Sequence, residues 1–469
     1  MKRIISMILV FTFVLTALAG CSGKPADTTT TETKAESAPV ETAEPAAQET
    51  KAEEPKTEET KPAAETDSAV PTIKLGFIAS LSSDGKVSSY FLEIGLQMVQ
   101  DLLASSGLKA NVEFVLRDLG RDSSEMKQRM TELKEAGCVA IISETLDDYG
   151  PATAQWASEN KIPVLFCPNY STEMTISNYS DYIFGTGLNA WGFIKVMALE
   201  AVGKRGIQNY AYVGKDSAAA VDAENILLYE AQKINPDFKC LASYRLSGAD
   251  ADFATIISTL LSGKEVPQMT LQQEGYTVIS FAMQAAMYDF YSASSVWSDV
   301  ITMPFIVDTL NKAGVYNYEG SYGATPMAWW DPNFDDFCKG FTAKGLEIYG
   351  KEYLPLEYSL YLYFAGMALN QALTDCINNG LDYTDGAVLK DALEKVSFEA
   401  FGSEHHFRDF DHQLTMPLYF VDAVDGGEEV NHLAVPADKS SVYAAEDYLP
   451  SMEEMKLYGE KYLNVNDRF

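Results

Sequence analysis

The stretch Ile73-Lys74-Leu75-Gly76-Phe77-Ile78 has the composition of a strand, and a loop of small residues follows it at 79–86. Apolar residues then recur at helical spacing, at positions 91, 94, 98 and 102. Another run, Val139-Ala140-Ile141-Ile142, is apolar at every position, as expected for a strand that is buried on both faces. Strands that alternate with helices across short loops favour a parallel, doubly wound sheet.

The same pattern starts again near residue 210. Tyr210-Ala211-Tyr212-Val213 is expected to be a strand, and the helix after it carries an apolar stripe from Ala223 to Ile234. Val278–Phe281 and Pro304–Val307 are expected to continue this second sheet, and Phe407–Val424 is expected to be a further strand. The sequence therefore predicts an α/β protein with two doubly wound parallel-sheet lobes.

The residues before Thr72 form two segments whose composition differs from that of the lobes. Lys2-Arg3 and the apolar run Ile4–Val14 are typical of a secretory signal peptide over residues 1–20, too short to remain as a spanning helix. This segment ends in Leu18-Ala19-Gly20-Cys21, which resembles the lipobox of bacterial lipoproteins. The resemblance implies cleavage before Cys21 and acylation of that residue, which anchors a protein to a membrane. The alternative is an ordinary signal peptide with a chance cysteine.

Residues 21–71 are expected to form a disordered tether between the anchor and the lobes. They consist almost entirely of Thr, Glu, Ala, Pro, Lys and Ser and contain no aromatic residue. Such a segment cannot bury enough apolar surface to offset the entropy lost on ordering.

Charge and missing motifs exclude several function classes. The chain carries 67 Asp and Glu against 35 Lys and Arg, a formal net charge of −32, so nucleic acid is excluded as the main partner. No nucleophile elbow, Walker loop or His-Glu-x-x-His motif is present, and we predict no catalytic residue and no cofactor. Glu404-His405-His406 and the nearby Asp409, Asp411 and His412 resemble a metal cluster. Because neighbouring strand residues point to opposite faces, we predict no metal site there.

Five cysteines remain besides Cys21, and an odd number cannot complete a disulfide framework. The sequence does not decide whether two of these five cysteines form a disulfide bridge. Three of them lie beside apolar strand or helix residues and are expected to behave as small buried side chains.

Several segments share a resemblance to one family. They are Phe407-Arg408-Asp409-Phe410-Asp411-His412-Gln413, the following Tyr419-Phe420-Val421, and Pro168-Asn169-Tyr170-Ser171-Thr172. In order and spacing they resemble the substrate-binding lipoproteins of bacterial ABC importers, in particular the branched-chain amino-acid (Leu/Ile/Val) binding family. The resemblance covers roughly Thr72 to Gly427. It implies the type I periplasmic binding fold, in which two lobes are joined by a multi-crossover hinge and hold the ligand in a cleft between them.

The resemblance also implies boundaries. The first lobe is expected to comprise residues 72–188 and 326–404, and the second residues 189–325 and 405–432. The C-terminal tail, 433–469, extends beyond the resemblance, and its spaced aromatic residues predict that it packs on a lobe.

Ligands of open parallel sheets bind beyond the carboxyl ends of the strands. In the family that the chain resembles, backbone N–H groups and small hydroxyls of the first lobe hold a ligand's carboxylate and amine, and an acid contacts the ligand from the second lobe. The residues expected to bind ligand here are Ser82, Ser83, Thr145, Asp147, Asn169, Tyr170, Ser171, Asp216 and Asp308. Each has the alternative role of a helix cap or a solvated side chain. The aromatic residue that the family often has after the restart strand is absent, since this chain reads Asp216-Ser217-Ala218-Ala219.

These expectations combine into one function. We expect a lipid-anchored, extracytoplasmic solute-binding protein that captures a small polar ligand, an amino acid or similar amine-bearing acid, and delivers it to the permease of an ABC importer. The partners are then the ligand, the permease and, through the anchor, the membrane. The alternatives are a ligand-sensing receptor protein of the same fold that signals to a membrane partner, and a surface hydrolase.

Overall fold

The computed structural model describes residues 70–81, 86–119, 123–145, 149–167, 171–246, 252–272, 275–298, 303–315, 320–423 and 441–465. The expected signal peptide, Cys21 and nearly all of the expected tether lie outside the described residues. Within the described ranges, no helix has both the length and the apolar character that crossing a membrane requires.

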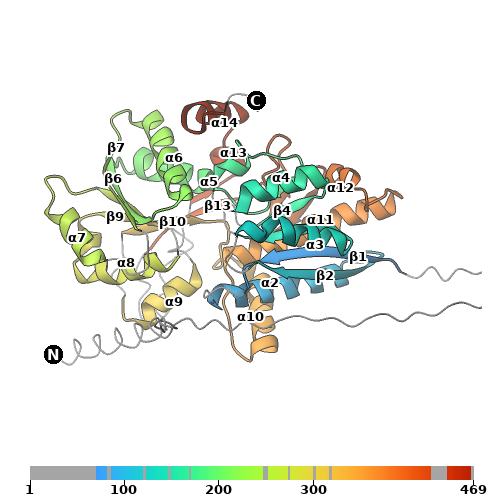
Figure 1. Cartoon of the computed structure of the whole chain (residues 1–469). Coiled ribbons are helices and arrows are strands. Elements are labelled where there is room, and N and C mark those ends of the chain that lie inside the picture. Colours follow the sequence, from blue (N-terminus) through green and yellow to red (C-terminus); the bar gives the residue numbers. More distant parts are fainter. Residues whose placement is uncertain are drawn as a thin grey trace, which may run out of the picture. The chain divides into compact units, whose positions relative to one another are not determined.

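A sheet of five parallel strands forms the first lobe, in the order β2-β1-β3-β4-β5. Figure 1 shows β1 and β2 side by side in this sheet. Its strands are β1 (Thr72–Ala79), β2 (Asn111–Asp118), β3 (Cys138–Glu144), β4 (Val164–Phe166) and β5 (Ile183–Gly185). After β1 the chain forms β2, which is an edge strand on one side of β1. It then forms β3 on the other side of β1. The strand order therefore reverses at β1 and β3, and loops that follow such a pair diverge and leave space for a ligand.

Helices cover both faces of this sheet, which explains why its central strands β1 and β3 contain runs of successive apolar residues. Phe77 packs in the core on the side of α2 and α11, and its neighbour Ile78 packs on the side of α3 and α4. The helices of this lobe are α2 (Lys86–Ser105), α3 (Met126–Glu135), α4 (Gly150–Asn160), α10 (Asp335–Tyr349), α11 (Glu357–Asn378) and α12 (Gly386–Leu393).

A seven-stranded sheet forms the second lobe, in the order β14-β13-β10-β9-β8-β6-β7. Its parallel strands are β6 (Asn209–Lys215), β7 (Lys239–Leu246), β8 (Met269–Gln272), β9 (Ser295–Ser298) and β10 (Ser321–Thr325). Two antiparallel strands, β13 (Leu418–Asp422) and β14 (Ser441–Tyr443), complete one edge.

Helices also cover both faces of the second sheet. Tyr210 and Tyr212 face α5 and α6, whereas Ala211 and Val213 face α7 and α8. The helices are α5 (Ala190–Met197), the π-helix η4 (Ala198–Lys204), α6 (Ala218–Ile234), α7 (Phe253–Ser262), α8 (Gly275–Met287) and α9 (Pro304–Lys312). The predicted fold class, two doubly wound parallel-sheet lobes, is confirmed.

Two predicted strands of the second lobe are wrong. Val278–Phe281 lies within helix α8, and Pro304–Val307 forms the start of helix α9, with Pro304 in its first turn. A short apolar run has no periodicity that separates a strand from a buried helix, and proline is favoured at a helix start. The strands that occupy these places in the sheet, β8 and β9, precede the two runs. Similarly, only β13 forms a strand of this sheet within the predicted strand Phe407–Val424.

Three segments connect the sheets: residues 186–189, 326–334 and 407–417, here called the hinge. The third follows the hairpin of β11 (Ser397–Ala400) and β12 (Ser403–His406) and lies against the first. Gln413 Nε2 donates hydrogen bonds to the carbonyl oxygens of Gly185 at 3.3 Å and Gly187 at 2.9 Å. A Cβ atom on Gly187 would lie 1.7 Å from the carbonyl oxygen of Cys167, so only glycine fits at this contact.

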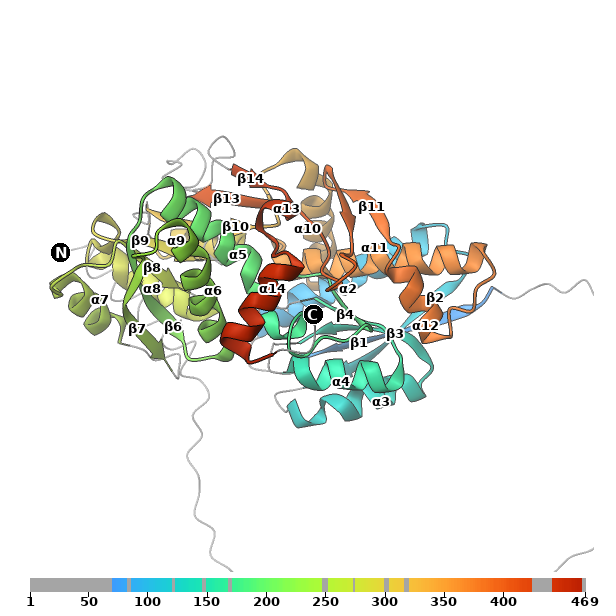
Figure 2. The ribbon, with the colours of Figure 1, turned by 90° about the horizontal axis from the view of Figure 1, so that it is seen from above.

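The described part of the C-terminal tail continues from β14 into α13 (Ala445–Tyr448), α14 (Met452–Tyr458) and the π-helix η9 (Gly459–Leu463). Figure 2 shows α14 between α6 of the second lobe and the region of β4 and α4 in the first. Tyr448, Met455 and Tyr458 are fully buried, so this segment is part of the packed core.

The contact between α2 and α11 predicts a strong effect of one added methyl group. A Cβ atom on Gly366 would lie 2.7 Å from Cγ1 of Val99, and overpacking of this kind lowers the free energy of unfolding by about 1–3 kcal/mol. We therefore expect Gly366→Ala to lower the midpoint of urea unfolding. Gly340→Ala is the matched control, because its added Cβ would have ordinary contact with Met98 at 3.6 Å and favour the helix by up to about 1 kcal/mol. Equal midpoints for both variants would contradict this account of the packing.

Candidate functional site

The loop after β1 is described only at its beginning. Leu81 donates its backbone N–H to Oδ1 of Asp118 at 3.0 Å, which ties the loop to the end of β2. Ser82 and Ser83, both predicted to bind ligand, lie outside the described residues.

At the carboxyl end of β3, small hydroxyls are buried together. Ser143 Oγ and Thr145 Oγ1 lie 2.9 Å apart, and both residues are shielded from solvent. Thr145 was predicted to bind ligand, and it follows β3 directly at the edge where ligands of parallel sheets bind. Asp147 lies outside the described residues.

Between Ser143 and Thr145 stands a buried acid, Glu144, whose side chain contacts Cys167 at the end of β4. Burial raises the pKa of the Glu144 carboxyl group well above its ordinary value, so the acid is held towards its neutral form. Burial, with the neighbouring Glu144, also raises the pKa of the Cys167 thiol, which accepts a hydrogen bond from Thr186 at 3.4 Å. Among the described residues, Oε1 of Glu144 has no hydrogen-bond partner. The sequence did not single out Glu144, because an acid at a strand end is usually solvated.

The segment after β4 leads towards the second lobe. Asn169 and Tyr170 lie outside the described residues, and Ser171 is buried. Its Oγ accepts the backbone N–H of Glu173 at 3.2 Å and so caps the short 3-10 helix η3 (Thr172–Met174). Ser171 therefore has the capping role that was the alternative for each loop hydroxyl, at a position next to the strand-end edge.

Thr172 makes a buried contact with the second lobe. Its backbone N–H and Oγ1 donate to the two oxygens of Asp222 on α6, at 2.8 and 3.0 Å. Tyr458 of α14 donates its hydroxyl to Asp222 Oδ1 at 2.6 Å. Burial raises the pKa of Asp222, although these hydrogen bonds act in the opposite direction. No local sequence signal identifies Asp222, because both of its partners are remote in the chain.

In the second lobe, the two predicted acids lie in different settings. Asp216 is exposed just after β6, and its backbone N–H donates to Leu246 O at 2.9 Å. Ser217, next to it, caps α6. Asp308 lies on α9 and forms an ion pair with Lys312 at 2.5 Å. Its expected position in a loop after a strand was wrong, because the preceding segment is helical.

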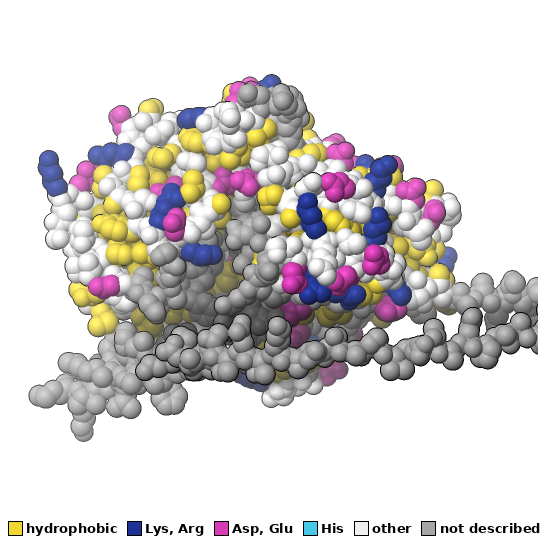
Figure 3. All heavy atoms as spheres, in the orientation of Figure 1, with side chains coloured by type: hydrophobic (Ala, Val, Ile, Leu, Met, Phe, Trp, Pro, Cys, Tyr) yellow, Lys and Arg dark blue, Asp and Glu magenta, His cyan; other side chains and the backbone are white. Residues whose placement is uncertain are grey.

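Of the predicted ligand-binding residues that the structure describes, Thr145, Ser171 and Asp216 follow strands, whereas Asp308 lies within a helix. Thr145 and Ser171 follow neighbouring strands, since β3 pairs with β4, and Asp216 follows β6 of the other sheet. On the face in Figure 3, acidic and basic side chains are interspersed among the described residues. That face therefore shows no continuous basic surface of the kind that nucleic acids require.

Two of the histidines that resemble a metal cluster, His405 and His412, contact backbone carbonyls, while Nδ1 of His406 lies 3.3 Å from Oγ1 of Thr415 and Nε2 of His412 lies 3.3 Å from Oε1 of Glu394. The ring nitrogens of His405 lie 2.8 Å from Thr415 O and 3.1 Å from Ala400 O, and Nδ1 of His412 lies 3.1 Å from Ile183 O. Among the described residues, no group of three or more His, Cys, Asp or Glu side chains is arranged to hold a metal ion. The five cysteines are all free thiols, so the possible bridge among them does not form.

Comparison with protein families agrees with this architecture. The model of the periplasmic binding protein family matches residues 72–428, which include both sheets up to β13 and the whole hinge. The chain belongs to the periplasmic binding protein family. No curated protein sequence matches it.

Solved structures of other periplasmic binding proteins show the same fold at low identity. An ABC transporter substrate-binding protein from Sphaerobacter thermophilus is 15% identical with a TM-score of 0.68, over 81% of this chain and 99% of that one. A branched-chain amino-acid ABC transporter periplasmic ligand-binding protein from Burkholderia xenovorans is 18% identical, with a TM-score of 0.66 over 81% and 98%. A solute-binding protein from Rhodopseudomonas palustris in complex with 3,4-dihydroxybenzoic acid is 16% identical, with a TM-score of 0.64 over 80% and 98%.

The buried Glu144 predicts a specific pH dependence of stability. Because its folded-state pKa is raised, the folded protein keeps a proton that the unfolded chain has lost above about pH 4.3. This one group therefore lowers the free energy of unfolding as the pH rises, by up to about 1.4 kcal/mol per pH unit until its folded pKa is reached. Glutamine has nearly the shape of the neutral acid but does not titrate. We therefore expect the free energy of unfolding of Glu144→Gln, relative to that of the wild type, to increase as the pH rises from 4 to 8.

Urea unfolding at several pH values measures this difference. Glu135→Gln, on the exposed end of α3, is the control and should follow the wild type, apart from a small constant offset. A constant difference between Glu144→Gln and the wild type over this pH range would show that folding does not raise the pKa of Glu144.

Proposed function

We propose that this periplasmic binding protein is a lipid-anchored, extracytoplasmic solute-binding protein that delivers a small polar ligand to an ABC importer. The observation that carries the proposal is the family match, which spans both lobes and all three hinge segments rather than one sheet alone. Two lobes on a hinge can close around a ligand, and the closed state is then favoured by its greater affinity for that ligand. Binding and release need no catalytic step.

The proposed ligand site lies between the carboxyl ends of the two sheets. It includes Ser82, Ser83, Thr145, Asp147, Asn169, Tyr170, Ser171, Asp216 and Asp308. The hydroxyl groups and backbone N–H groups of the first lobe suit a carboxylate, because they are neutral donors next to strand ends. The acids suit a ligand's ammonium group, because an unpaired cation would be costly to enclose.

An amino acid or similar amine-bearing acid meets both requirements. The branched-chain amino-acid protein and the protein in complex with 3,4-dihydroxybenzoic acid share this fold, so the fold alone does not select the ligand. A carboxylate is common to the two ligand classes. What separates them is the ammonium group, and the acids of the second lobe are the residues that can recognise it.

A thermal-shift screen with matched variants tests this ligand class. Amino acids should raise the melting temperature of the wild type, because a ligand that binds only the folded state stabilises it by about 2.7 kcal/mol at a hundred times its Kd. Asp216→Asn should weaken binding about tenfold or more, as expected for the loss of a charge-assisted hydrogen bond. Asp308→Asn should weaken it less, since Lys312 already neutralises that carboxylate.

Benzoic acids are the control ligands in the same screen. A rise in melting temperature with benzoates but not with amino acids would overturn the ligand class and leave solute binding in place. No rise with any small carboxylate would overturn the carboxylate site itself.

The anchor is a separate prediction. If Cys21 is acylated, Cys21→Ser should remove metabolic fatty-acid labelling and move the protein from the membrane fraction to the soluble fraction of bacterial cells, because a single seryl hydroxyl cannot replace the thioether-linked chains. Ser22→Ala is the neighbouring control and should remain labelled. Unchanged labelling of Cys21→Ser would remove the lipid anchor from the proposal.

A further inference from the structure

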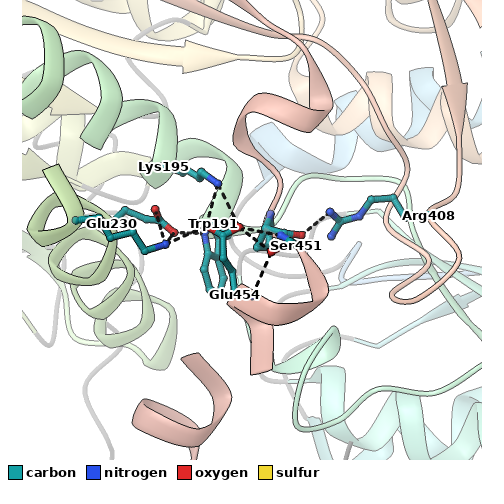
Figure 4. Close-up of polar contacts among 8 residues, drawn as sticks. Trp191, Lys195, Glu230, Arg408, Ser451 and Glu454 are labelled. Carbon is teal, nitrogen blue, oxygen red and sulfur yellow. Dashed lines mark hydrogen bonds and ion pairs between the residues drawn. The ribbon is translucent and has the colours of Figure 1, made fainter. Parts of the chain in front are cut away.

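The tail after β14 makes an ionic contact with the helices of the second lobe (Figure 4). Glu454 of α14 accepts hydrogen bonds from Lys195 of α5 at 3.4 Å and from Lys233 of α6 at 3.0 Å. Although burial opposes it, the hydrogen bonds from Ser451 and Lys233 and the nearby positive charge lower the pKa of Glu454 to about 2. Glu454 is therefore ionised at any physiological pH, and α14 is held to α5 and α6 by charge.

Helices α5 and α6 also pack against an aromatic residue of the tail. Trp191 donates its ring N–H to Glu230 at 2.9 Å, and Glu230 also pairs with Lys233 at 3.0 Å. The ring of Tyr458 packs edge-on against Trp191 and Tyr229, with centroids 4.8 and 5.7 Å apart. Buried aromatic pairs of this geometry add to the stability of a contact beyond the area that they bury.

The tail also contacts the third hinge segment. Arg408, which pairs with Asp411, donates from Nη1 to the carbonyl oxygen of Pro450 at 2.7 Å. The buried Tyr448 donates its hydroxyl to Met416 O at 2.6 Å. Residues just before α14 are therefore attached to the segment through which the chain passes between the lobes.

Finally, the tail reaches the first lobe. Tyr458 shares Asp222 with Thr172, so one buried carboxylate joins the tail, the second lobe and the first lobe. Close by, a Cβ atom on Gly459 would lie 3.0 Å from Cγ2 of Ile176, which belongs to the segment after η3. The tail thus touches every part that moves when two lobes change their relative position.

We propose that residues 444–463 form a clasp, an intramolecular strap that controls separation of the lobes through Tyr458 and Asp222. If the lobes part here, Asp222 loses both donors of Thr172 and keeps only Tyr458. The Tyr458 hydroxyl acts against the burial of Asp222 and favours its carboxylate form, which holds the two donors of Thr172 more strongly than a neutral acid would. The family match ends at residue 428, so the clasp is an addition to the part of the chain that matches the family.

Hydrogen exchange of the mature, ligand-free protein tests the clasp. Tyr458→Phe removes one hydroxyl from a buried carboxylate and retains the ring. We expect amide exchange in the peptide 171–178 to become about tenfold faster or more, because without the Tyr458 hydroxyl, burial shifts Asp222 towards its neutral form, which holds the Thr172 N–H less strongly than a carboxylate does. Exchange in β1 should remain unchanged, which separates local opening from global unfolding. Tyr462→Phe is the matched control on the next turn, because the Tyr462 hydroxyl makes no hydrogen bond with the described residues.

A second pair of variants examines the ionic attachment. Glu454→Gln should accelerate exchange in the same peptide, and Glu453→Gln, which alters an exposed neighbour, should not. Unchanged exchange at 171–178 in Tyr458→Phe, or equal acceleration in Tyr458→Phe and Tyr462→Phe, would overturn the clasp. The experiment uses no ligand, so this outcome is independent of the solute-binding proposal.

Discussion

The constraint on which the structure depends is that the central strands of both sheets are parallel and buried on both faces. Parallel neighbours cannot be joined by a tight turn, so each connection crosses the sheet, usually through a helix. All the parallel strands then end at one edge, and the loops after them meet there. Thr145 and Ser171 follow neighbouring strand ends for this reason, although 25 residues separate them in the sequence. The position of the proposed ligand site follows from the sheet, and the loop residues decide its chemistry.

Two buried acids near this edge show how the setting determines the role of a carboxyl group. Glu144 contacts a thiol and has one oxygen without a partner among the described residues, so burial dominates and favours the neutral acid. Asp222 receives three donors from two other parts of the chain, and these partly offset its burial. Glu144 therefore keeps an oxygen at a strand end that can still take part in a hydrogen bond. Asp222 instead uses its oxygens for hydrogen bonds that fix the position of one lobe against the other.

The fold could be predicted from the sequence where burial leaves a local pattern. The runs at 139–142 and 210–213 are strands because they are apolar on both faces over a length that suits a sheet. The runs at 278–281 and 304–307 are equally apolar and equally short, yet they lie in α8 and α9, since nothing in four residues distinguishes a strand from part of a buried helix. The site was less predictable still. Asp222 is 50 residues from Thr172 and 236 from Tyr458, and such pairings leave no trace in local spacing.

The proposed clasp bears on binding because closure of two lobes is an equilibrium between arrangements. A ligand can shift that equilibrium only by its difference in affinity for the two states, and the protein's own contacts set the starting ratio. Each 1.4 kcal/mol by which internal contacts favour the binding-competent arrangement raises the apparent affinity about tenfold when that arrangement is rare. A buried carboxylate shared by Tyr458 and Thr172 has an energy of this order. The proposed clasp therefore predicts that changes in the C-terminal tail tune ligand affinity without altering any residue that touches the ligand.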